Sequence, residues 1–324
     1  MGLKRKIGKA KKVENSLRDA KEIYIEEKKA LNQADATIKS ADYSIEMWIK
    51  YLEKTERSIN CSDVDRSYIF AFTNFYLNDD MKSSTLNHYL RDIRAFVYWC
   101  QKEEYITEKF KIDLVKQQQT IKETYTDEEL LKLLARPAKT ASYVEWRSWA
   151  IVNWILATGH RASTVASITL GDLNFRKGEI YVQQTKTNKA YITPLSPALA
   201  TTIKEFIKMF RAEARDTDFL FANIGDMPLT VDALKHSIRK FNLDRDVERT
   251  SVHALRHTFA KNWIRNTGDV FRLQKLLGHS TLEMTRNYVN MFDEDLKEGF
   301  ETYNPLDNIK KNASRTQKIK KSKD

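Results

Sequence analysis

Residues 275–289 read KLLGHSTLEMTRNYV, and in this stretch Tyr288 follows His279 by nine residues. A tyrosine in such a setting is usually a packed residue of an amphipathic helix, so Tyr288 alone indicates no chemistry. A phenol is also a competent nucleophile when neighbouring groups accept its proton and polarise the group that it attacks. The interpretation of this stretch therefore depends on the residues that stand upstream of it.

Three upstream segments place basic side chains where a phosphate could bind. In ATGHRASTVASI (157–168), Arg161 stands at the head of an expected helix, where free backbone N–H groups and a guanidinium can together hold an anion. In VHALRHTFAKN (252–262), His253 and Arg256 are three residues apart and share one helical face. The alternating segment around 178–195 predicts a hairpin whose TKT turn carries Lys186. Each segment is weak support by itself.

Metal and nucleotide chemistry find little support in this sequence. Two-metal phosphoryl transfer needs clustered carboxylates, whereas the acidic residues here are scattered. The densest group, FDEDLKE (292–298), is better explained as the start of a helix, where acids interact favourably with the helix dipole. Zinc-ligand spacing and glycine-rich phosphate loops are absent. We therefore expect a mechanism that uses no cofactor and no metal.

The charge distribution suggests a polyanionic partner. The net charge is +11, and residues 1–12 carry six Lys or Arg with no acid. Residues 308–324 carry seven Lys or Arg against one acid. Basic ends on a globular body favour nucleic acid, although solvated tails that aid solubility are the alternative.

The fold is expected to be mainly α with a small β-hairpin or sheet, since the chain has only nine Gly and five Pro. No apolar run approaches the length of a membrane span. The lack of an apolar leader and the two separated cysteines favour a cytoplasmic protein. The predicted parts are a basic N-terminal extension with one helix (1–34), a helical domain (35–112), a linker (113–123), a second domain (124–303) and a basic tail (304–324).

Together, TGHR, the hairpin TKT, HALRHTFA and LGHSTLEMTRNY closely resemble the motifs of the tyrosine recombinases, also called tyrosine integrases. The intervals fit that pattern, because 23 residues separate Arg256 from His279 and nine separate His279 from Tyr288. The resemblance covers residues 125–300, and residues 83–106 are similar to the last long helix of the family's core DNA-binding domain. It implies a two-domain clamp around duplex DNA, with residues 124–303 as the catalytic domain.

The resemblance also implies a catalytic set. Its members are Arg161, Lys186, His253, Arg256, His279 and Tyr288. The tyrosine would attack the scissile phosphorus and leave a covalent 3′-phosphotyrosyl link, without ATP. The arginines would clamp the non-bridging oxygens in place of a metal, and the lysine would be the general acid for the departing 5′-oxygen. The histidines would hydrogen-bond the phosphate or the phenol proton.

Two positions depart from the family's pattern. His160 stands between Gly and Arg of the first motif, where an apolar residue is usual, and Thr164 stands where an acid is common. The supporting role of that acid is therefore in doubt here, although threonine can still form a hydrogen bond. His257 is expected to be a packed or supporting histidine.

The chain's DNA and protein partners can also be anticipated. At the start of the helix that opens at the Ser/Thr cap after Lys82, the residues Lys82, Ser84, Thr85 and Arg91 could reach DNA, or form only an exposed capped helix start. Phe292, Leu296, Phe300 and Tyr303 form one stripe of a helix at about 292–303. This stripe either packs on its own domain or, as the family suggests, docks in trans on a neighbour in a homotetramer on synapsed DNA.

Several uses remain open within and beyond the family. The basic extensions and the TKT motif favour an integrase or transposase of a mobile element, acting on a specific site in the bacterial nucleoid with possible accessory DNA-bending or directionality proteins. Chromosome-dimer resolution is the alternative. A catalytically silent DNA-binding protein and a metal-dependent nuclease are the alternatives from other classes, against which the intact catalytic set and the scattered acids speak.

Overall fold

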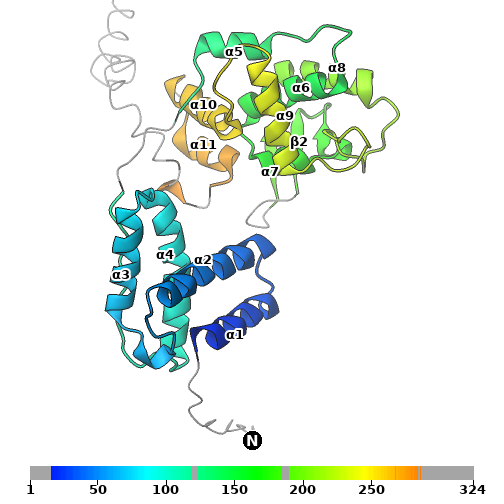
Figure 1. Cartoon of the computed structure of the whole chain (residues 1–324). Helices are drawn as coiled ribbons and strands as arrows, with labels where there is room; N and C mark the ends of the chain where they lie inside the picture. The colour runs from blue at the N-terminus through cyan, green and yellow to red at the C-terminus, as the bar shows by residue number, and fades with distance from the viewer. Residues whose placement is uncertain are drawn as a thin grey trace, which may run out of the picture. The chain divides into compact units, whose positions relative to one another are not determined.

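In a computed structural model of the chain, the described residues are 16–117, 123–183, 190–266, 268–279, 281–283 and 285. The chain divides into two compact units, Met1–Thr120 and Ile121–Asp324 (Figure 1). Each unit is built on its own apolar core. The expected fold class, mainly helical with one small sheet, is confirmed. None of the described helices is both long and apolar enough to cross a bilayer.

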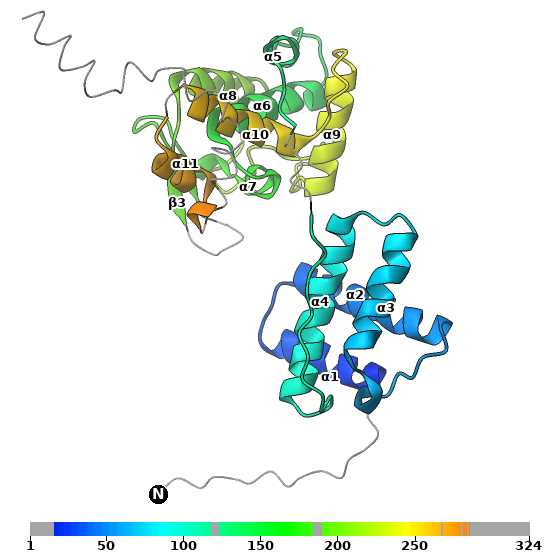
Figure 2. The ribbon, with the colours of Figure 1, turned by 90° about the vertical axis from the view of Figure 1, so that its left-hand side faces the viewer.

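The described part of the first unit is a bundle of four α-helices. They are α1 (Leu17–Ala30), α2 (Asp35–Lys54), α3 (Arg66–Asn78) and α4 (Ser83–Lys102), with a 3-10 turn at Cys61–Asp63. Helix α2 packs against both α1 and α4, and α3 runs alongside α4 (Figure 2).

Apolar spacing explains this bundle. The face that the sequence places on α2 is fully buried, at Ile45, Trp48, Ile49 and Leu52. Helix α1 begins at a capping box in which Ser16 and Asp19 satisfy each other's backbone N–H groups. The sequence set α1 apart as part of a basic extension, yet it packs into the core of this unit through Leu17 and Ala20.

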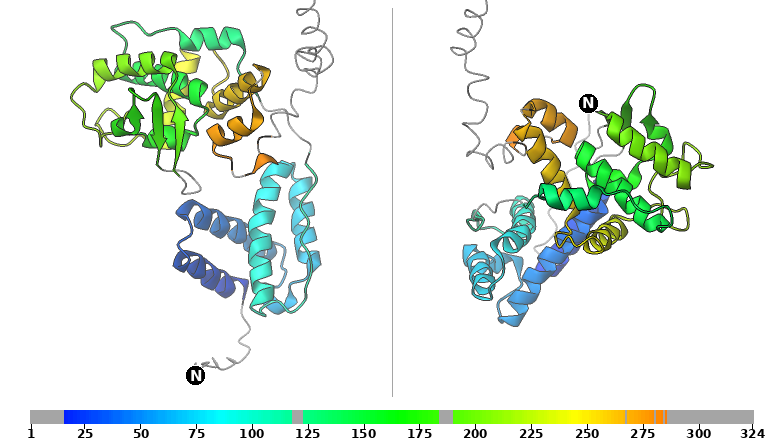
Figure 3. Two further views of the ribbon diagram at one scale, coloured as in Figure 1. Left: turned by 180° about the vertical axis from the view of Figure 1, so that it is seen from behind. Right: turned by 90° about the horizontal axis from the view of Figure 1, so that it is seen from above.

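The other elements of the second unit pack around one buried helix, α6 (Tyr143–Thr158). The elements of this unit are α5 (Asp127–Leu134), α6, α7 (Ala162–Ser167), a 3-10 turn (Leu170–Asp172), β1 (Leu173–Asn174), β2 (Glu179–Val182), β3 (Tyr191–Pro194), α8 (Pro197–Phe210), α9 (Val231–Leu243), α10 (Val252–Arg265) and α11 (Val270–Leu277). Helix α6 packs against α5, α8, α9 and α10 (Figure 3). Because α6 has neighbours on several sides, it buries Trp146, Ile151, Trp154 and Ile155 almost completely.

Local signals set the boundaries of these elements. The capping box expected at Thr126 and Glu129 is present at the start of α5. The expected hairpin is also present: β2 pairs antiparallel with β3, and Val182 faces Tyr191 across the ladder. The turn residues 184–189, which include Lys186, lie outside the described residues.

Candidate active site

Helix α6 ends at a glycine in the left-handed backbone conformation, two residues before Arg161. Gly159 has φ +66°, and its N–H donates to the Ile155 carbonyl. An added Cβ there would lie 2.4 Å from Phe259 Cδ1, so only glycine fits this turn. Arg161 follows in extended conformation as the N-cap residue of α7. The sequence expectation that Arg161 heads a helix after a terminating glycine is confirmed.

Arg256 brings three chain segments together beside Arg161. It lies on α10 and is 3% exposed. Its Nη1 donates to the Gly159 carbonyl at 2.6 Å, and its Nη2 donates to the Leu277 carbonyl at 2.9 Å. Arg161 Nη1 donates to the same Leu277 carbonyl at 3.2 Å. Two guanidinium groups from distant segments therefore lie side by side at the ends of α6 and α11.

His279, just past α11, completes this cluster. Its Nε2 lies 2.9 Å from Arg256 Nη2, and its Nδ1 lies 2.8 Å from Thr285 Oγ1. A guanidinium only donates, so Nε2 accepts and the ring proton resides on Nδ1, which donates to Thr285. The arginine thus fixes both the tautomer and the orientation of the imidazole.

Tyr191 of β3 borders the same cluster, and the sequence did not single it out as a site residue. At Gly278 an added Cβ would lie 3.6 Å from Tyr191 Cε1 and 3.7 Å from Arg161 Nη1, so the phenol ring and this guanidinium flank one glycine. Burial raises the pKa of Tyr191, although the charges of Arg256 and Arg161 act in the opposite direction. The phenol therefore stays protonated at neutral pH and can act there as a neutral hydrogen-bond donor.

His160 ties α6 to the sheet. The Trp154 indole donates to His160 Nδ1 at 3.1 Å, so Nε2 carries the proton and donates to Thr193 Oγ1 at 2.9 Å. Burial, helped by the nearby charge of Arg256, lowers the pKa of His160 to about 3. A neutral imidazole thus stands where the resemblance implied an apolar residue, and it links the residue before Arg161 to β3.

His253 lies one helical turn before Arg256, and its neighbouring side chains are different. It is exposed on the first turn of α10, and its ring meets that of His257 at a centroid distance of 5.1 Å. Together with Lys235, His236 and Arg239 of α9 it lines a pocket of about 290 Å³. Sequence reasoning missed these three residues, although their spacing on a predicted helix could have revealed a shared basic face.

The remaining residues singled out from the sequence are Lys186, Tyr288 and Thr164. Lys186 and Tyr288 lie outside the described residues. Thr164 is buried in α7. Within the described ranges, no group of three or more His, Cys, Asp or Glu is placed to hold a metal ion.

The candidate DNA contacts of the first unit lie on its surface. Lys82, Ser84, Thr85 and Arg91 are all exposed at or near the start of α4. The Ser/Thr cap expected there is wrong, because Lys82 occupies the N-cap position and makes no side-chain cap hydrogen bond, while Ser83 is already helical. A contact between these residues and DNA stays a prediction.

The chain is similar in sequence to known proteins. Residues 123–295 match the model of the phage integrase family. The tyrosine recombinase XerD of Pasteurella multocida is 27% identical over 292 residues, which cover 88% of this chain and 95% of the relative. XerD of Listeria monocytogenes serovar 1/2a is 24% identical over 276 residues, covering 83% and 92%.

Solved structures share the fold. The post-cleavage complex of the XerH recombinase bound to palindromic difH has a TM-score of 0.69 at 19% identity, with 88% of this chain and 84% of that chain covered. A lambda integrase (75–356) dimer bound to a COC′ core site has a TM-score of 0.67 at 16% identity, covering 86% and 97%. The Tn1549 transposon integrase (82–397) with circular intermediate DNA has a TM-score of 0.64 at 20% identity, covering 84% and 94%. The family match spans more than half of the chain, and the chain therefore belongs to the phage integrase family as a tyrosine recombinase, an enzyme that cuts and rejoins DNA at specific sites.

Proposed function

We propose that this recombinase cuts each strand with Tyr288. The phenol oxygen forms a bond to the scissile phosphorus, the bond to the 5′-oxygen breaks, and a 3′-phosphotyrosyl ester and a free 5′-hydroxyl result. Lys186 gives the proton that the departing 5′-oxygen needs, and His253 or His279 hydrogen-bonds the phosphate or takes up the phenol proton. The ester keeps the energy of the broken diester, so religation needs no ATP.

One observation carries this proposal: Arg161 and Arg256 converge on a single carbonyl, that of Leu277. Two adjacent guanidinium groups supply parallel N–H donors for the non-bridging oxygens of one phosphate. Their positive charge offsets the negative charge that grows in the transition state, which is the task that metal ions perform in other phosphoryl-transfer enzymes. His279 lies against Arg256 in the same cluster, and it would have to exchange its contact with Thr285 or with Arg256 to bond the phosphate.

The basic pocket beside His253 supports a DNA path that leads to this site. Lys235 and Arg239 can hold flanking phosphates, because cationic side chains displace counterions from duplex DNA. In the first unit, Lys82, Ser84, Thr85 and Arg91 would supply further contacts. We expect the affinity to come mainly from phosphates and to fall steeply with salt.

A nicked suicide duplex that carries the recombination site tests the chemistry. Incubation with excess EDTA should give a covalent protein–DNA adduct on a denaturing gel, and Tyr288→Phe should abolish it. Tyr303→Phe is the matched control, since it changes a second C-terminal phenol and should leave the adduct intact. Absence of an adduct with the wild-type chain on its own site would favour a silent DNA-binding protein. Cleavage that requires Mg²⁺ and leaves no adduct would favour a nuclease.

The biological use proposed is integration and excision of a mobile element, for which the basic ends and the structural likeness to a transposon integrase are the support. Chromosome-dimer resolution is the second candidate, since the curated relatives are XerD recombinases. Deletion of the gene separates the two. Loss of the element's circular junctions with normal chromosome segregation supports the first, and chromosome dimers support the second.

The active assembly is proposed to be a homotetramer on synapsed DNA, in which the segment at about 292–303 docks in trans. This segment lies outside the described residues. A mainly apolar pocket of about 500 Å³ between α5, α6 and α10 is a suitable acceptor. It is lined by Leu130, Leu134, Leu156, Phe259, Asn262, Trp263, Asn266 and Gly268. Its aliphatic and aromatic lining suits the stripe that begins with Phe292 and Leu296.

Deleting residues 292–324 should then abolish synapsis, and Leu134→Asp at the pocket should weaken it. Leu131→Asp is the matched control, since Leu131 lies on the same helix, is 73% exposed and does not line the pocket. Native gels with DNA would report the tetramer. Unchanged synapsis and cleavage after the deletion would show that docking in trans is wrong.

A further inference from the structure

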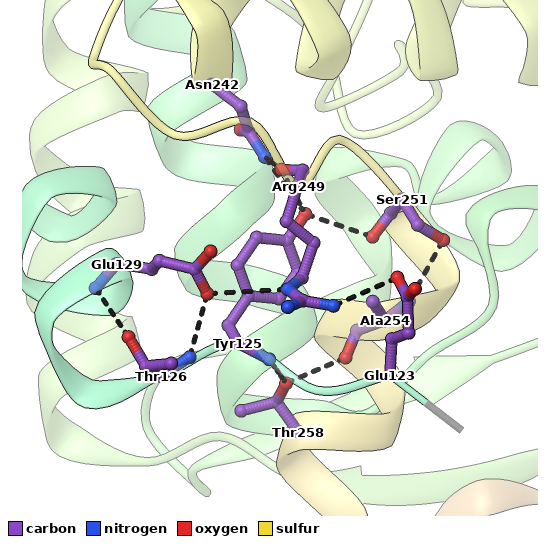
Figure 4. Close-up of polar contacts among 9 residues, drawn as sticks. All are labelled: Glu123, Tyr125, Thr126, Glu129, Asn242, Arg249, Ser251, Ala254 and Thr258. Atoms are coloured by element: carbon purple, nitrogen blue, oxygen red, sulfur yellow. Dashed lines mark hydrogen bonds and ion pairs between the residues drawn. The ribbon is translucent and has the colours of Figure 1, made fainter. Parts of the chain in front are cut away.

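Tyr125 lies a few residues after the start of the second unit, and it is almost completely buried, with 4% of its surface exposed. It lies between α5, the end of α9 and the start of α10, as Figure 4 shows. None of the catalytic roles proposed above uses this side chain. A buried phenol needs hydrogen-bond partners, and those of Tyr125 all belong to the segment that leads into α10 or to α9.

The phenol group holds the backbone in front of α10. Tyr125 OH lies 3.0 Å from the Arg249 carbonyl and 3.1 Å from the Ser251 carbonyl, and its single hydrogen is shared between them. Asn242 Nδ2 donates to the same phenol oxygen at 2.9 Å and to the Arg249 carbonyl at 2.8 Å. Ser251 is the N-cap residue of α10. The phenol therefore fixes the point at which the catalytic helix begins.

The backbone of the same residue holds α10 two turns further on. Tyr125 N–H donates to Thr258 Oγ1 at 2.9 Å, and that hydroxyl donates to the Ala254 carbonyl at 2.8 Å. Thr258 is 1% exposed, so water does not compete for this contact. One residue thus contacts α10 on both sides of the turn that carries His253 and Arg256.

The ion pairs around Arg249 add little to the attachment of α10. Arg249 pairs with Glu123 at 2.9 Å and with Glu129 at 3.4 Å. The Glu123 side chain is 74% exposed, and exposed ion pairs contribute little to stability, while the less exposed Glu129 makes only the longer contact. The buried hydrogen bonds of Tyr125 therefore dominate the attachment.

We propose that Tyr125 is a positioning residue for DNA cleavage, one that fixes the axial position of α10 and so places the Arg256 guanidinium against the scissile phosphate. This proposal rests on the function proposed above. Tyr125 is almost completely buried, so its loss should change the rate of the chemical step and leave DNA affinity nearly unaltered. A displacement of about 1 Å at a catalytic group can lower a rate about 100-fold, so even a small slip of α10 should be measurable.

The test compares Tyr125→Phe with Tyr143→Phe. Both variants delete one phenol hydroxyl that donates to a backbone carbonyl in the same unit, since Tyr143 OH donates to the Ala222 carbonyl at 2.9 Å. Tyr143 lies at the start of α6, and its hydroxyl bonds to the segment between α8 and α9 rather than to α10. Thr258→Val removes the acceptor at the other end of the attachment and is the second test variant. DNA affinity, single-turnover adduct formation on a suicide duplex, and hydrogen exchange of the free protein are measured for all three.

Tyr125→Phe and Thr258→Val should form adduct about tenfold more slowly than the wild type, with DNA dissociation constants within about twofold. Amide exchange should accelerate in peptides covering 250–258, and Tyr143→Phe should show neither change. Equal adduct rates in Tyr125→Phe and wild type, or equal losses in Tyr125→Phe and Tyr143→Phe, overturn the proposal. If the wild-type chain forms no adduct, the proposed function fails. The exchange comparison, which needs no DNA, then still decides whether Tyr125 holds α10.

Discussion

His160→Gln should remove a large part of the acid sensitivity of the second unit. The imidazole is 1% exposed and is held neutral between the Trp154 indole, which donates to Nδ1, and Thr193, which accepts from Nε2. Protonation would place a donor opposite the indole donor and bury a charge close to Arg256. Glutamine has no titrating group near neutral pH and retains an N–H that can reach Thr193.

The size of the effect follows from the pKa of the imidazole in each state. The folded pKa of about 3 lies below the ordinary value of 6.5, so the unfolded chain takes up the proton first as the pH falls. The stabilising contribution of the neutral ring is therefore complete above pH 6.5 and is lost as the pH falls toward 3. Between pH 7 and pH 5, linkage gives a loss of about 2 kcal/mol from this one group. The same figure results for any folded pKa well below 5.

Urea unfolding at pH 7, 6 and 5 measures this contribution. Tryptophan fluorescence reports mainly the second unit, because four of the six tryptophans lie between residues 146 and 263. The His160→Gln variant should be less stable to unfolding than the wild type at pH 7, since glutamine cannot hydrogen-bond both Trp154 and Thr193. The difference between the two proteins should shrink by about 2 kcal/mol at pH 5. Parallel curves for wild type and His160→Gln over this range would refute a neutral, buried imidazole.

Three further outcomes are expected. Gly159→Ala should cost about 3 kcal/mol of unfolding free energy, because φ is +66° and the new Cβ would lie 2.4 Å from Phe259. Gly178→Ala, with φ +67° but no contact under 3.6 Å, should cost only about 1 kcal/mol, and equal costs in denaturant unfolding would contradict this packing argument. Arg256→Lys should lower the adduct rate about 100-fold and leave DNA affinity almost unchanged. The reason is that an ammonium group cannot reproduce the two-pronged guanidinium contact with the Gly159 and Leu277 carbonyls. A wild-type rate would contradict the proposed role of the guanidinium. Excess EDTA should leave the adduct rate unchanged, and strong inhibition that added Mg²⁺ reverses would contradict a metal-free mechanism.

Local signals made much of the fold predictable. The periodic face of α2, the capping box at Thr126 and the alternation on either side of Lys186 depend only on residues a few positions apart. Such patterns reveal which element forms and which face it buries. They failed at the start of α4, where Lys82 took the cap position, because the exact first residue of a helix depends on small local differences.

The sequence by itself determined the chemical identity and order of the site residues, and therefore the family. Only the tertiary structure decided which groups touch. The Arg256 contact with Gly159 spans 97 positions and the Tyr125 contact with Thr258 spans 133, and no pattern of neighbouring residues encodes such pairs. His160 illustrates the difference, since the sequence showed only an unusual residue beside Arg161. Its neutral state and its partners follow from burial, which forces a polar group to take whichever donors and acceptors the packed elements offer.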